Sequence, residues 1–376
     1  MKVLIINHNC GIGSVGKICC DIAEEYEKDG NTVKIAYGRD SFVPAAYKKY
    51  AVRIGTPIGV RVHALKTRLF DEHGLGSRIA TKNFLLWAES FNPDLLWIHC
   101  IHGYYINYEL LFAWIKTRPF MTVKWTMHDC WAFTGHCSHF TVAGCFKWKK
   151  QCKNCCQSKD YPRAIFRDNC SNNFIRKKRA FSGVNNMLII TPSKWLADYV
   201  KQSFFKNYDI EIHHNKVNKS VFKPTKSNFR EKYNIQNRRI ILGVANVWSE
   251  RKGLGEFFKL AKMLDEKYII VLVGVEPKRM RKFPSNILGV ERTKNQEELA
   301  AIYTTADLFI NPSMEETFGM TTVEALACGT DAVVMAGTAC EEIAEEYGGI
   351  VVPPGDINKL YNIIVNYPYK KAGELK

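Results

Sequence analysis

Short runs rich in branched aliphatic residues alternate along the chain with longer segments in which apolar and polar residues mix. In the first part of the chain these runs are KVLIIN (2–7), TVKIAY (32–37), LLWIH (95–99), TVKWTMH (122–128) and MLIITPS (187–193). Such runs predict buried strands, and the amphipathic segments between them predict helices. The alternation therefore indicates a parallel sheet whose strands are joined by helices.

The same alternation restarts after a polar stretch near residues 225–238. The second series comprises IILGVA (240–245), YIIVLVGV (268–275), LFINPS (308–313), DAVVMA (331–336) and GIVVPP (349–354). We therefore expect two doubly wound α/β domains, one over residues 1–225 and one over residues 226–376. Ligands bind beyond the carboxyl ends of the strands in such sheets, so we expect a cleft between the two sets of strand ends.

The composition fits a folded chain of two domains, with 376 residues, 46% hydrophobic and 24% charged. No apolar run reaches the roughly 18 residues of a membrane span, and the first residues lack the pattern of a signal peptide. We expect a cytoplasmic protein whose 13 cysteines stay reduced, as thiols or metal ligands.

The net charge of +16 is confined to the N-terminal part. Residues 226–376 hold 20 Lys and Arg against 20 Asp and Glu, so the whole excess lies in residues 1–225. A one-sided positive field suits an anionic partner, such as a phosphate, a nucleic acid or an acidic membrane face. Charge alone does not choose among these partners.

A glycine-rich segment, GIGSVGK (11–17), follows the first predicted strand. It satisfies the dinucleotide motif GxGxxG, but the second strand ends in Gly38 and Arg39, with Asp40 only beyond them, instead of the acid that holds a ribose. It also lacks the hydroxyl residue of a P-loop, because Ile18 follows Lys17. What remains is a helix start that favours an anion, or merely a tight turn.

The strongest candidate site lies in NPSMEETFGMTTVEALACG (311–329), where a predicted strand ends, a loop turns and a helix starts near Gly319. Glu316 stands in the loop, and Glu324 is expected about two turns into the helix. Carboxylates so placed can hold two hydroxyl-bearing groups of one ligand, while N–H groups at the helix start suit a phosphate. The alternative is a pair of solvated charges, and spacing alone does not separate the two interpretations.

The segment EETFGMTTVEALACGT (315–330) resembles the two-glutamate signature of retaining GT-B glycosyltransferases of family 4. Five longer segments resemble bacterial exopolysaccharide glycosyltransferases of the colanic-acid and capsule type: DEHGLGSRIAT (71–81), HGYYIN (102–107), WTMHDCWAFTGHCSHF (125–140), TPSKWLA (191–197) and NPSMEETFG (311–319). The resemblance extends from Val3 to about Asp356. It implies the GT-B fold, two Rossmann-like domains facing across a cleft, and an acceptor-binding N-terminal and a donor-binding C-terminal domain.

The resemblance also implies an activity. A sugar would pass, with retention of configuration and without a metal, from a nucleotide-diphosphate sugar to a glycan or polyprenyl-diphosphate-linked acceptor. The process would be exopolysaccharide, capsule or lipopolysaccharide synthesis, and the enzyme would be cytoplasmic or peripheral at the inner face of the plasma membrane. No cofactor is expected for catalysis, and no nucleic acid is expected as a partner.

Residue roles follow from the same resemblance. Glu316 would hold hydroxyls of the donor sugar, Glu324 the ribose, and the N–H groups of Gly319 and Met320 the diphosphate. Arg251 and Lys252 would neutralise the leaving diphosphate, although the family's usual arginine five residues before Lys252 is Val247 here. The candidate donor-binding residues are Gly13, Phe318, Gly319, Met320 and Glu324.

In the N-terminal half, His128 ends a predicted strand and corresponds to the family's active-site histidine. The candidate catalytic residues are therefore His128, Glu316, Arg251 and Lys252. The candidate acceptor-binding residues are Gly11, Ser14, Lys17 and His99. For His102, His136 and His139 we favour a structural role.

A cysteine-rich insertion, at about 130–180, contains Cys137, Cys145, Cys152 and Cys155. Four such cysteines could form a structural zinc site, and the alternative is ordinary buried thiols. The insertion also carries basic runs, around Lys147–Lys153 and Arg176–Arg179. Solvated helix faces are the default interpretation of such runs, and a lipid-diphosphate acceptor at an anionic membrane is the functional one.

Two other functions fit single features of the chain. A nicotinamide-dependent oxidoreductase would use GxGxxG but leaves the two glutamates unexplained. A zinc-knuckle nucleic-acid-binding protein would use the cysteines and the basic half.

Overall fold

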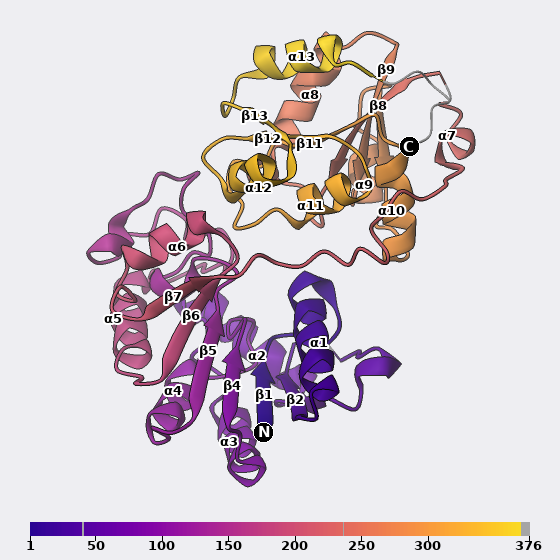
Figure 1. Cartoon of the computed structure of the whole chain (residues 1–376). Coiled ribbons are helices and arrows are strands. Elements are labelled where there is room, and N and C mark those ends of the chain that lie inside the picture. The colour runs from indigo at the N-terminus through magenta and orange to yellow at the C-terminus, as the bar shows by residue number, and fades with distance from the viewer. Residues whose placement is uncertain (40, 236, 370–376) are drawn as a thin grey trace. The chain divides into compact units, whose positions relative to one another are not determined.

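The computed structural model describes residues 1–39, 41–235 and 237–369. The chain divides into two compact units, Met1–His213 and His214–Lys376, which are described separately below. Each unit is a parallel sheet with helices on its faces (Figure 1). The sequence places the division after Thr225, but Phe222 is buried in the core of the second unit, so the intervening segment packs there.

The first unit contains a seven-stranded sheet in the order β3-β2-β1-β4-β5-β6-β7. All its pairings are parallel. The strands are β1 Lys2–Ile6, β2 Thr32–Tyr37, β3 Ala51–Arg53, β4 Leu95–Ile98, β5 Thr122–Thr126, β6 Met187–Thr191 and β7 Asp209–Ile212. The helices are α1 Gly13–Lys28, α2 Pro57–Phe70, α3 Arg78–Phe91, α4 Tyr108–Lys116, α5 Cys170–Phe181 and α6 Lys194–Lys201, with short 3-10 turns η1 Ala45–Tyr47, η2 Trp131–Phe133 and η3 Lys147–Lys149.

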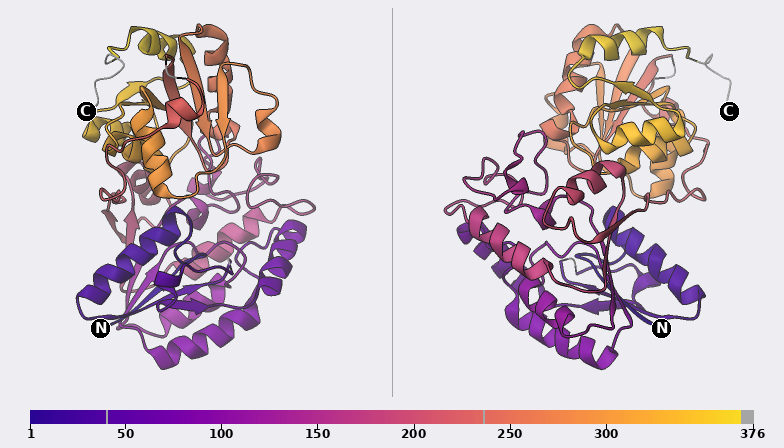
Figure 2. Two further views of the ribbon diagram at one scale, coloured as in Figure 1. Left: turned by 90° about the vertical axis from the view of Figure 1, so that its right-hand side faces the viewer. Right: turned by 60° about the vertical axis from the view of Figure 1, so that its left-hand side comes forward.

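Strand β1 shows why helices cover both faces of this sheet. Successive side chains of a strand point to opposite faces. Val3 and Ile5 lie in a core with Cys19, on α1, whereas Leu4 and Ile6 lie in a larger core that includes side chains of α3, α4 and α5. A strand buried on both faces needs a continuous apolar run, which is the pattern seen in KVLII. The helices on the two sides of the sheet can be followed in Figure 2.

The second unit repeats the plan with six parallel strands in the order β10-β9-β8-β11-β12-β13. The strands are β8 Arg239–Val244, β9 Tyr268–Val273, β10 Ile287–Val290, β11 Leu308–Asn311, β12 Ala332–Met335 and β13 Ile350–Val352. The helices are α7 Phe229–Lys232, α8 Leu254–Met263, α9 Pro277–Met280, α10 Gln296–Thr305, α11 Met320–Ala327, α12 Ala339–Tyr347 and α13 Ile357–Asn366, with the 3-10 turn η4 Glu250–Lys252.

Every predicted strand run contains a strand, and the predicted pair of doubly wound α/β units is confirmed. The strands that the sequence did not predict are β3, β7 and β10, and all three lie at a sheet edge. An edge strand is covered on fewer sides, so its apolar pattern is short and weak. The four residues of β7, for example, read DIEI and are mostly exposed.

Within the described residues, none of the helices combines the length and the apolar composition needed to cross a bilayer.

Candidate functional site

The two glutamates singled out by sequence lie near the topological switch point of the second sheet. In the strand order, β8 lies between β9 and β11, so the connections after β8 and β11 leave the sheet in opposite directions. Such a point leaves a crevice at the carboxyl ends of the strands, where ligands of α/β sheets bind. Turn η4 follows β8, and the loop carrying Glu316 follows β11.

Asn311, the last residue of β11, fastens this loop to the helix that follows. Its amide Nδ2 donates to Thr322 Oγ1 at 3.0 Å, and its Oδ1 accepts from Ser313 Oγ at 2.6 Å. Asn311 and Ser313 are both buried. The loop is therefore held at both ends by buried hydrogen bonds, which restrict the position of Glu316.

Helix α11 begins directly after Gly319, which adopts a left-handed conformation with φ of 92°. A Cβ at this position would lie 2.5 Å from Cys340 Sγ, so a glycine is required on two counts. The helix begins at Met320, where the first N–H groups have no preceding turn to accept their hydrogen bonds. This is the geometry expected of an anion site at a helix start.

Lys252 forms an ion pair with Glu316. Its neighbour Arg251 donates from Nη1 to the carbonyl of Glu315 at 2.9 Å, and the N–H of Met314 donates to the carbonyl of Arg251 at 2.9 Å. Turn η4 and the loop after β11 thus hold each other through main-chain and side-chain bonds. The structure therefore brings together three of the predicted catalytic residues, Arg251, Lys252 and Glu316.

Glu324 is half-buried in the second turn of α11. Burial raises the pKa of its carboxyl group from 4.5 to about 7, although a hydrogen bond from the Tyr303 hydroxyl, 3.1 Å from Oε2, acts to lower it. Tyr303 is fully buried, on α10, and nothing in the sequence distinguished it from any other core aromatic residue. Tyr303 fixes one carboxyl oxygen of Glu324.

Phe318, predicted to bind the donor, is 3% exposed and packs with Val323 and Ile343. Its ring also lies 5.6 Å from that of His214, which hydrogen-bonds Glu342 at 2.9 Å. The Phe318 side chain therefore anchors the loop between β11 and α11.

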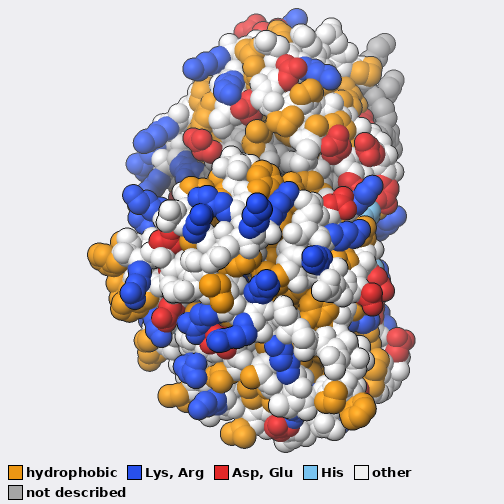
Figure 3. Space-filling view, turned by 90° about the vertical axis from the view of Figure 1, so that its left-hand side faces the viewer, with side chains coloured by type: hydrophobic (Ala, Val, Ile, Leu, Met, Phe, Trp, Pro, Cys, Tyr) orange, Lys and Arg blue, Asp and Glu red, His pale blue; other side chains and the backbone are white. Residues whose placement is uncertain are grey.

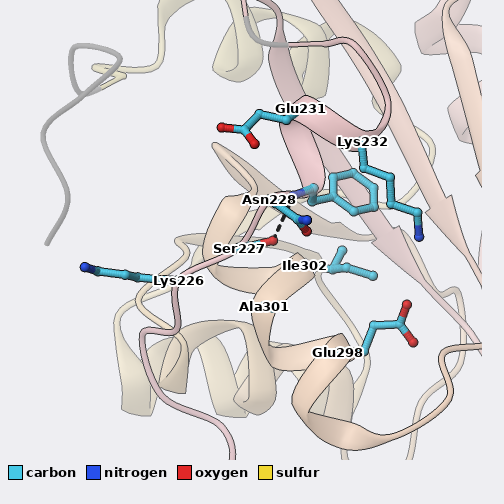
Figure 4. A pocket seen from close by; sticks show the side chains of 9 residues that line it. Lys226, Ser227, Asn228, Glu231, Lys232, Glu298, Ala301 and Ile302 are labelled. Carbon is cyan, nitrogen blue, oxygen red and sulfur yellow. Dashed lines mark hydrogen bonds between the residues drawn. The ribbon is translucent and has the colours of Figure 1, made fainter.

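A separate hollow of about 430 Å³ lies beside α7 and α10 (Figure 4). It is lined by Lys226, Ser227, Asn228, Phe229, Glu231, Lys232, Glu298, Ala301 and Ile302. None of the predicted site residues lines it, so we do not assign the donor to this hollow.

In the first unit, the glycine-rich segment forms the turn between β1 and α1. Gly11 and Gly13 have φ values of 73° and 68°, and α1 begins at Gly13. Ser14 is exposed in the first turn, and Lys17 is half-buried one turn later. Asp40 lies outside the described residues.

His99 and His128 follow neighbouring strands of the first sheet, β4 and β5. His99 Nδ1 and His128 Nε2 are 2.9 Å apart, and their rings stack at 5.2 Å. Burial lowers the pKa of His128 to about 4 and that of His99 well below its usual value. Both rings are therefore neutral at pH 7, with one donating the shared proton and the other accepting it.

His102, for which the sequence analysis favoured a structural role, pairs with Asp129 at 3.0 Å. Burial acts to raise the pKa of Asp129, but the charge and hydrogen bond of His102 hold it well below its usual range. Together with His99 and His128, the pair lines a hollow of only about 10 Å³. The sequence signal for this pair was the His128-Asp129 dipeptide, whose second residue was not assigned a role.

Two pairs of cysteines in the insertion share hydrogen bonds. Cys155 shares a hydrogen bond with Cys170, which lowers the pKa of Cys155 to about 7, and Cys145 shares one with Cys156. Across residues 1–39, 41–235 and 237–369, no three His, Cys, Asp or Glu side chains are grouped so that they could hold a metal ion. The zinc site at Cys137, Cys145, Cys152 and Cys155 stays a prediction.

The basic runs of the insertion are partly used within the protein. Lys147 donates to the carbonyls of Lys153 and Asn154, at 3.2 and 3.0 Å. Arg176 pairs with Glu109, and Lys177 is 1% exposed. Lys177 donates to two carbonyls, and burial lowers its pKa to about 7. One face of the molecule nevertheless carries many more Lys and Arg than Asp and Glu side chains (Figure 3).

Residues 238–367 match the family described as "Glycosyl transferases group 1". This match lies within the C-terminal unit, His214–Lys376.

Two curated relatives match part of the chain. The chain is 25% identical over 170 residues to the putative colanic acid biosynthesis glycosyl transferase WcaC of Escherichia coli, an alignment that covers 43% of this chain and 41% of that protein. It is 31% identical over 127 residues to the N,N'-diacetylbacillosaminyl-diphospho-undecaprenol alpha-1,3-N-acetylgalactosaminyltransferase of Campylobacter jejuni, covering 32% and 33%. These alignments thus span less than half the length of either relative.

Solved structures share the fold of each unit. Sucrose-phosphate synthase from Thermosynechococcus elongatus superposes with a TM-score of 0.69 at 18% identity, covering 97% of this chain and 90% of that chain. HepE of Anabaena, solved with UDP-glucose, superposes with a TM-score of 0.63 at 15% identity, covering 97% and 89%. The predicted GT-B fold of two Rossmann-like units is confirmed.

Proposed function

We propose that the chain transfers a sugar from a nucleotide-diphosphate sugar to a glycan or lipid-linked acceptor, with retention of configuration and without a metal. The single observation that carries this proposal is the Lys252–Glu316 ion pair at the switch point of the second sheet, directly before the start of α11. The carboxylate there suits the hydroxyls of a sugar. The cation and the start of the helix suit the negative charge of a diphosphate. The group 1 family match of the same unit supports it.

The proposed donor pose follows from the chemistry of each group. The diphosphate is stabilised by the start of α11 and by Lys252, which turns from Glu316 to the departing phosphate. Glu316 then accepts hydrogen bonds from sugar hydroxyls. Glu324 accepts from the ribose through the carboxyl oxygen that Tyr303 does not hold. Charge that develops on the leaving group is stabilised by cationic side chains and backbone N–H groups, so no metal is needed for that step.

His128 supplies the proposed contact of the first unit with the transferred sugar. Its ring is neutral at pH 7 because burial lowers its pKa to about 4. A neutral imidazole, hydrogen-bonded to His99, can contact a sugar hydroxyl without adding charge.

The acceptor is proposed from chemistry and from relatives. The Campylobacter jejuni relative acts, by its name, on a diphospho-undecaprenol sugar. The positive charge of residues 1–225 suits an acceptor of this kind, since a lipid diphosphate is anionic and lies at a membrane surface. Exopolysaccharide or capsule synthesis is the process we propose on these grounds.

A donor screen tests the proposal. The thermal unfolding of the full chain would be measured with UDP-glucose, UDP-N-acetylglucosamine, GDP-mannose, NAD and a short oligonucleotide. We expect stabilisation by at least one nucleotide sugar and loss of that stabilisation in Glu324→Gln. Stabilisation by NAD alone, or by the oligonucleotide alone, would contradict the proposal and favour one of the two other functions.

The donor identified in this way then allows the reaction to be followed. Incubation with a polyprenyl-diphosphate saccharide should release the nucleoside diphosphate, in the presence of a chelator as well as without it. Proton NMR of the new glycosidic bond should show the anomeric configuration of the donor. A product with inverted configuration would refute the retaining assignment, but it would not contradict the proposed donor site.

A further inference from the structure

Helix α2 exposes its apolar side chains and buries polar ones. Ile58, Val62 and Leu65 are 70%, 61% and 56% exposed. The fully buried side chains of the helix are His63 and Thr67. A helix that packs on a core normally shows the opposite arrangement, with its apolar stripe inward. The outward stripe therefore needs an explanation that the fold of the unit does not supply.

The exposed apolar residues form one continuous stripe. With about 100° per residue, Ile58, Val62, Leu65 and the half-buried Leu69 fall within an arc of roughly 60°. His63 and Thr67 lie on the opposite side. His63 holds α2 to the unit through hydrogen bonds, because its Nε2 accepts from the N–H of Gly76 at 3.0 Å and its Nδ1 lies 2.9 Å from Ser77 Oγ. Thr67 Oγ1 donates within the helix, to the carbonyl of His63 at 3.0 Å. The helix is thus fixed by its polar side with the stripe facing solvent.

Cations border the stripe on both sides. By the same helical geometry, Arg61 and Arg68 lie along one edge, and Lys66 lies along the other. Lys66 pairs with Glu72, just beyond the helix, at 2.7 Å. The helix itself, PIGVRVHALKTRLF, contains no Asp or Glu. Long basic side chains beside an apolar stripe can reach outward to anionic groups while their stems stay in apolar surroundings.

A loop from the cysteine-rich insertion extends the same surface. The N–H of Ile165 donates to the carbonyl of Arg68 at 2.7 Å, which places this loop against the end of α2. Ile165 and Phe166 are 53% and 78% exposed, and the exposed Arg163 and Arg167 flank them. Two segments almost a hundred residues apart therefore present the same combination of exposed apolar and basic side chains.

We infer that this surface, formed by α2 and residues 163–167, docks onto an anionic lipid bilayer, with α2 lying in the plane of the headgroups. Apolar side chains enter the boundary of the acyl chains, and the arginines bind lipid phosphates. A second copy of the chain fits less well, because a twofold contact would bring the cationic edges of two identical helices together. Docking in this way does not depend on the proposed sugar transfer.

Vesicle co-sedimentation of the full chain tests this inference, with no nucleotide sugar present. The vesicles would be phosphatidylcholine alone, or phosphatidylcholine and phosphatidylglycerol in equal parts, at salt concentrations of about 50 and about 500 mM. We expect binding to the anionic vesicles that weakens at high salt. Leu65→Glu should weaken binding about tenfold, because it removes apolar area that enters the bilayer and adds a negative charge that the anionic lipids repel. Arg61→Gln with Arg68→Gln should reduce the preference for phosphatidylglycerol.

Phe120→Glu provides the matched control, since Phe120 is an isolated apolar residue that is 96% exposed outside this surface. Its binding should equal that of the wild type, and circular dichroism melting should show that all variants are folded. Undiminished binding of Leu65→Glu would overturn the inference. So would a lipid-free dimer that Leu65→Glu dissociates, because the second copy would then cover the stripe.

Discussion

The Tyr303 hydroxyl, on α10, donates a hydrogen bond to Glu324 Oε2, on α11, at 3.1 Å. This bond occupies one acceptor position of Oε2 and leaves Oε1 without a bond from Tyr303. Burial of the carboxyl group raises the pKa of Glu324 from 4.5 to about 7. The residue that we propose as the ribose contact therefore titrates near physiological pH.

Glu324 should make the free protein less stable as the pH rises. A carboxyl group whose pKa is higher in the folded state stabilises that state below pH 4.5, and the contribution is lost as the pH rises through about 7. Between pH 4.5 and 8, Glu324→Gln should lose up to roughly 3 kcal/mol less unfolding free energy than the wild type. Urea unfolding at both pH values measures it. As a control, Glu297→Gln, at an exposed position, should lose as much unfolding free energy as the wild type. The prediction would be contradicted if Glu324→Gln also lost as much as the wild type.

Lys252→Ala should lower kcat for sugar transfer by about a hundredfold to a thousandfold, with a smaller change in KM. The lysine is proposed to act on charge that develops at the leaving phosphate, and removing one such contact typically costs this much. Steady-state kinetics with the donor from the screen measures both constants. Lys259→Ala, which breaks the exposed pair with Glu256 at 2.8 Å, is the control. A change in KM alone would show that Lys252 only binds the donor.

His128 should make the protein sensitive to acid. Its pKa is lowered from 6.5 to about 4, so the folded state resists protonation, and stability falls as the pH drops through this interval. His128→Asn should lose up to roughly 3 kcal/mol less unfolding free energy than the wild type between pH 7 and 4. Guanidinium unfolding at the two pH values tests this. His213→Asn, at a half-exposed side chain, should behave like the wild type.

Gly319→Ala should destabilise the C-terminal unit more than Gly337→Ala. Both glycines are left-handed, with φ of 92° and 79°, so alanine costs about 1 kcal/mol at each position. At Gly319 the new Cβ would also lie 2.5 Å from Cys340 Sγ, whereas nothing lies within 4 Å at Gly337. The clash should add about 1–3 kcal/mol. Equal melting temperatures for the two variants would show that the loop relaxes freely.

The zinc site predicted from Cys137, Cys145, Cys152 and Cys155 calls for about one zinc ion per chain after purification under reducing conditions. Plasma mass spectrometry measures the metal, and Cys145→Ser should lower it. The unrelated Cys328→Ser, in the other unit, should not. Metal at background level would refute the site and leave the paired thiols that the structure shows.

The sequence was sufficient for the central strands and for the position of the candidate site. A strand buried on both faces requires a continuous apolar run, so each strand inside the two sheets was visible as such a run. The weak edge strands β3, β7 and β10 were not visible, because their pairing depends on a neighbour distant in sequence. The spacing of Glu316 and Glu324 was also readable, but spacing did not distinguish a ligand site from two solvated charges.

Only the tertiary structure decided what these residues contact. Lys252 and Glu316 are 64 residues apart and meet because β8 and β11 are neighbours in the sheet. Tyr303 reaches Glu324, and His102 pairs with Asp129, through the packing of separate elements. The outward stripe of α2 was likewise invisible, since periodicity shows that a helix is amphipathic but not which side is buried. Local pattern fixes an element, whereas burial and pKa depend on long-range contacts.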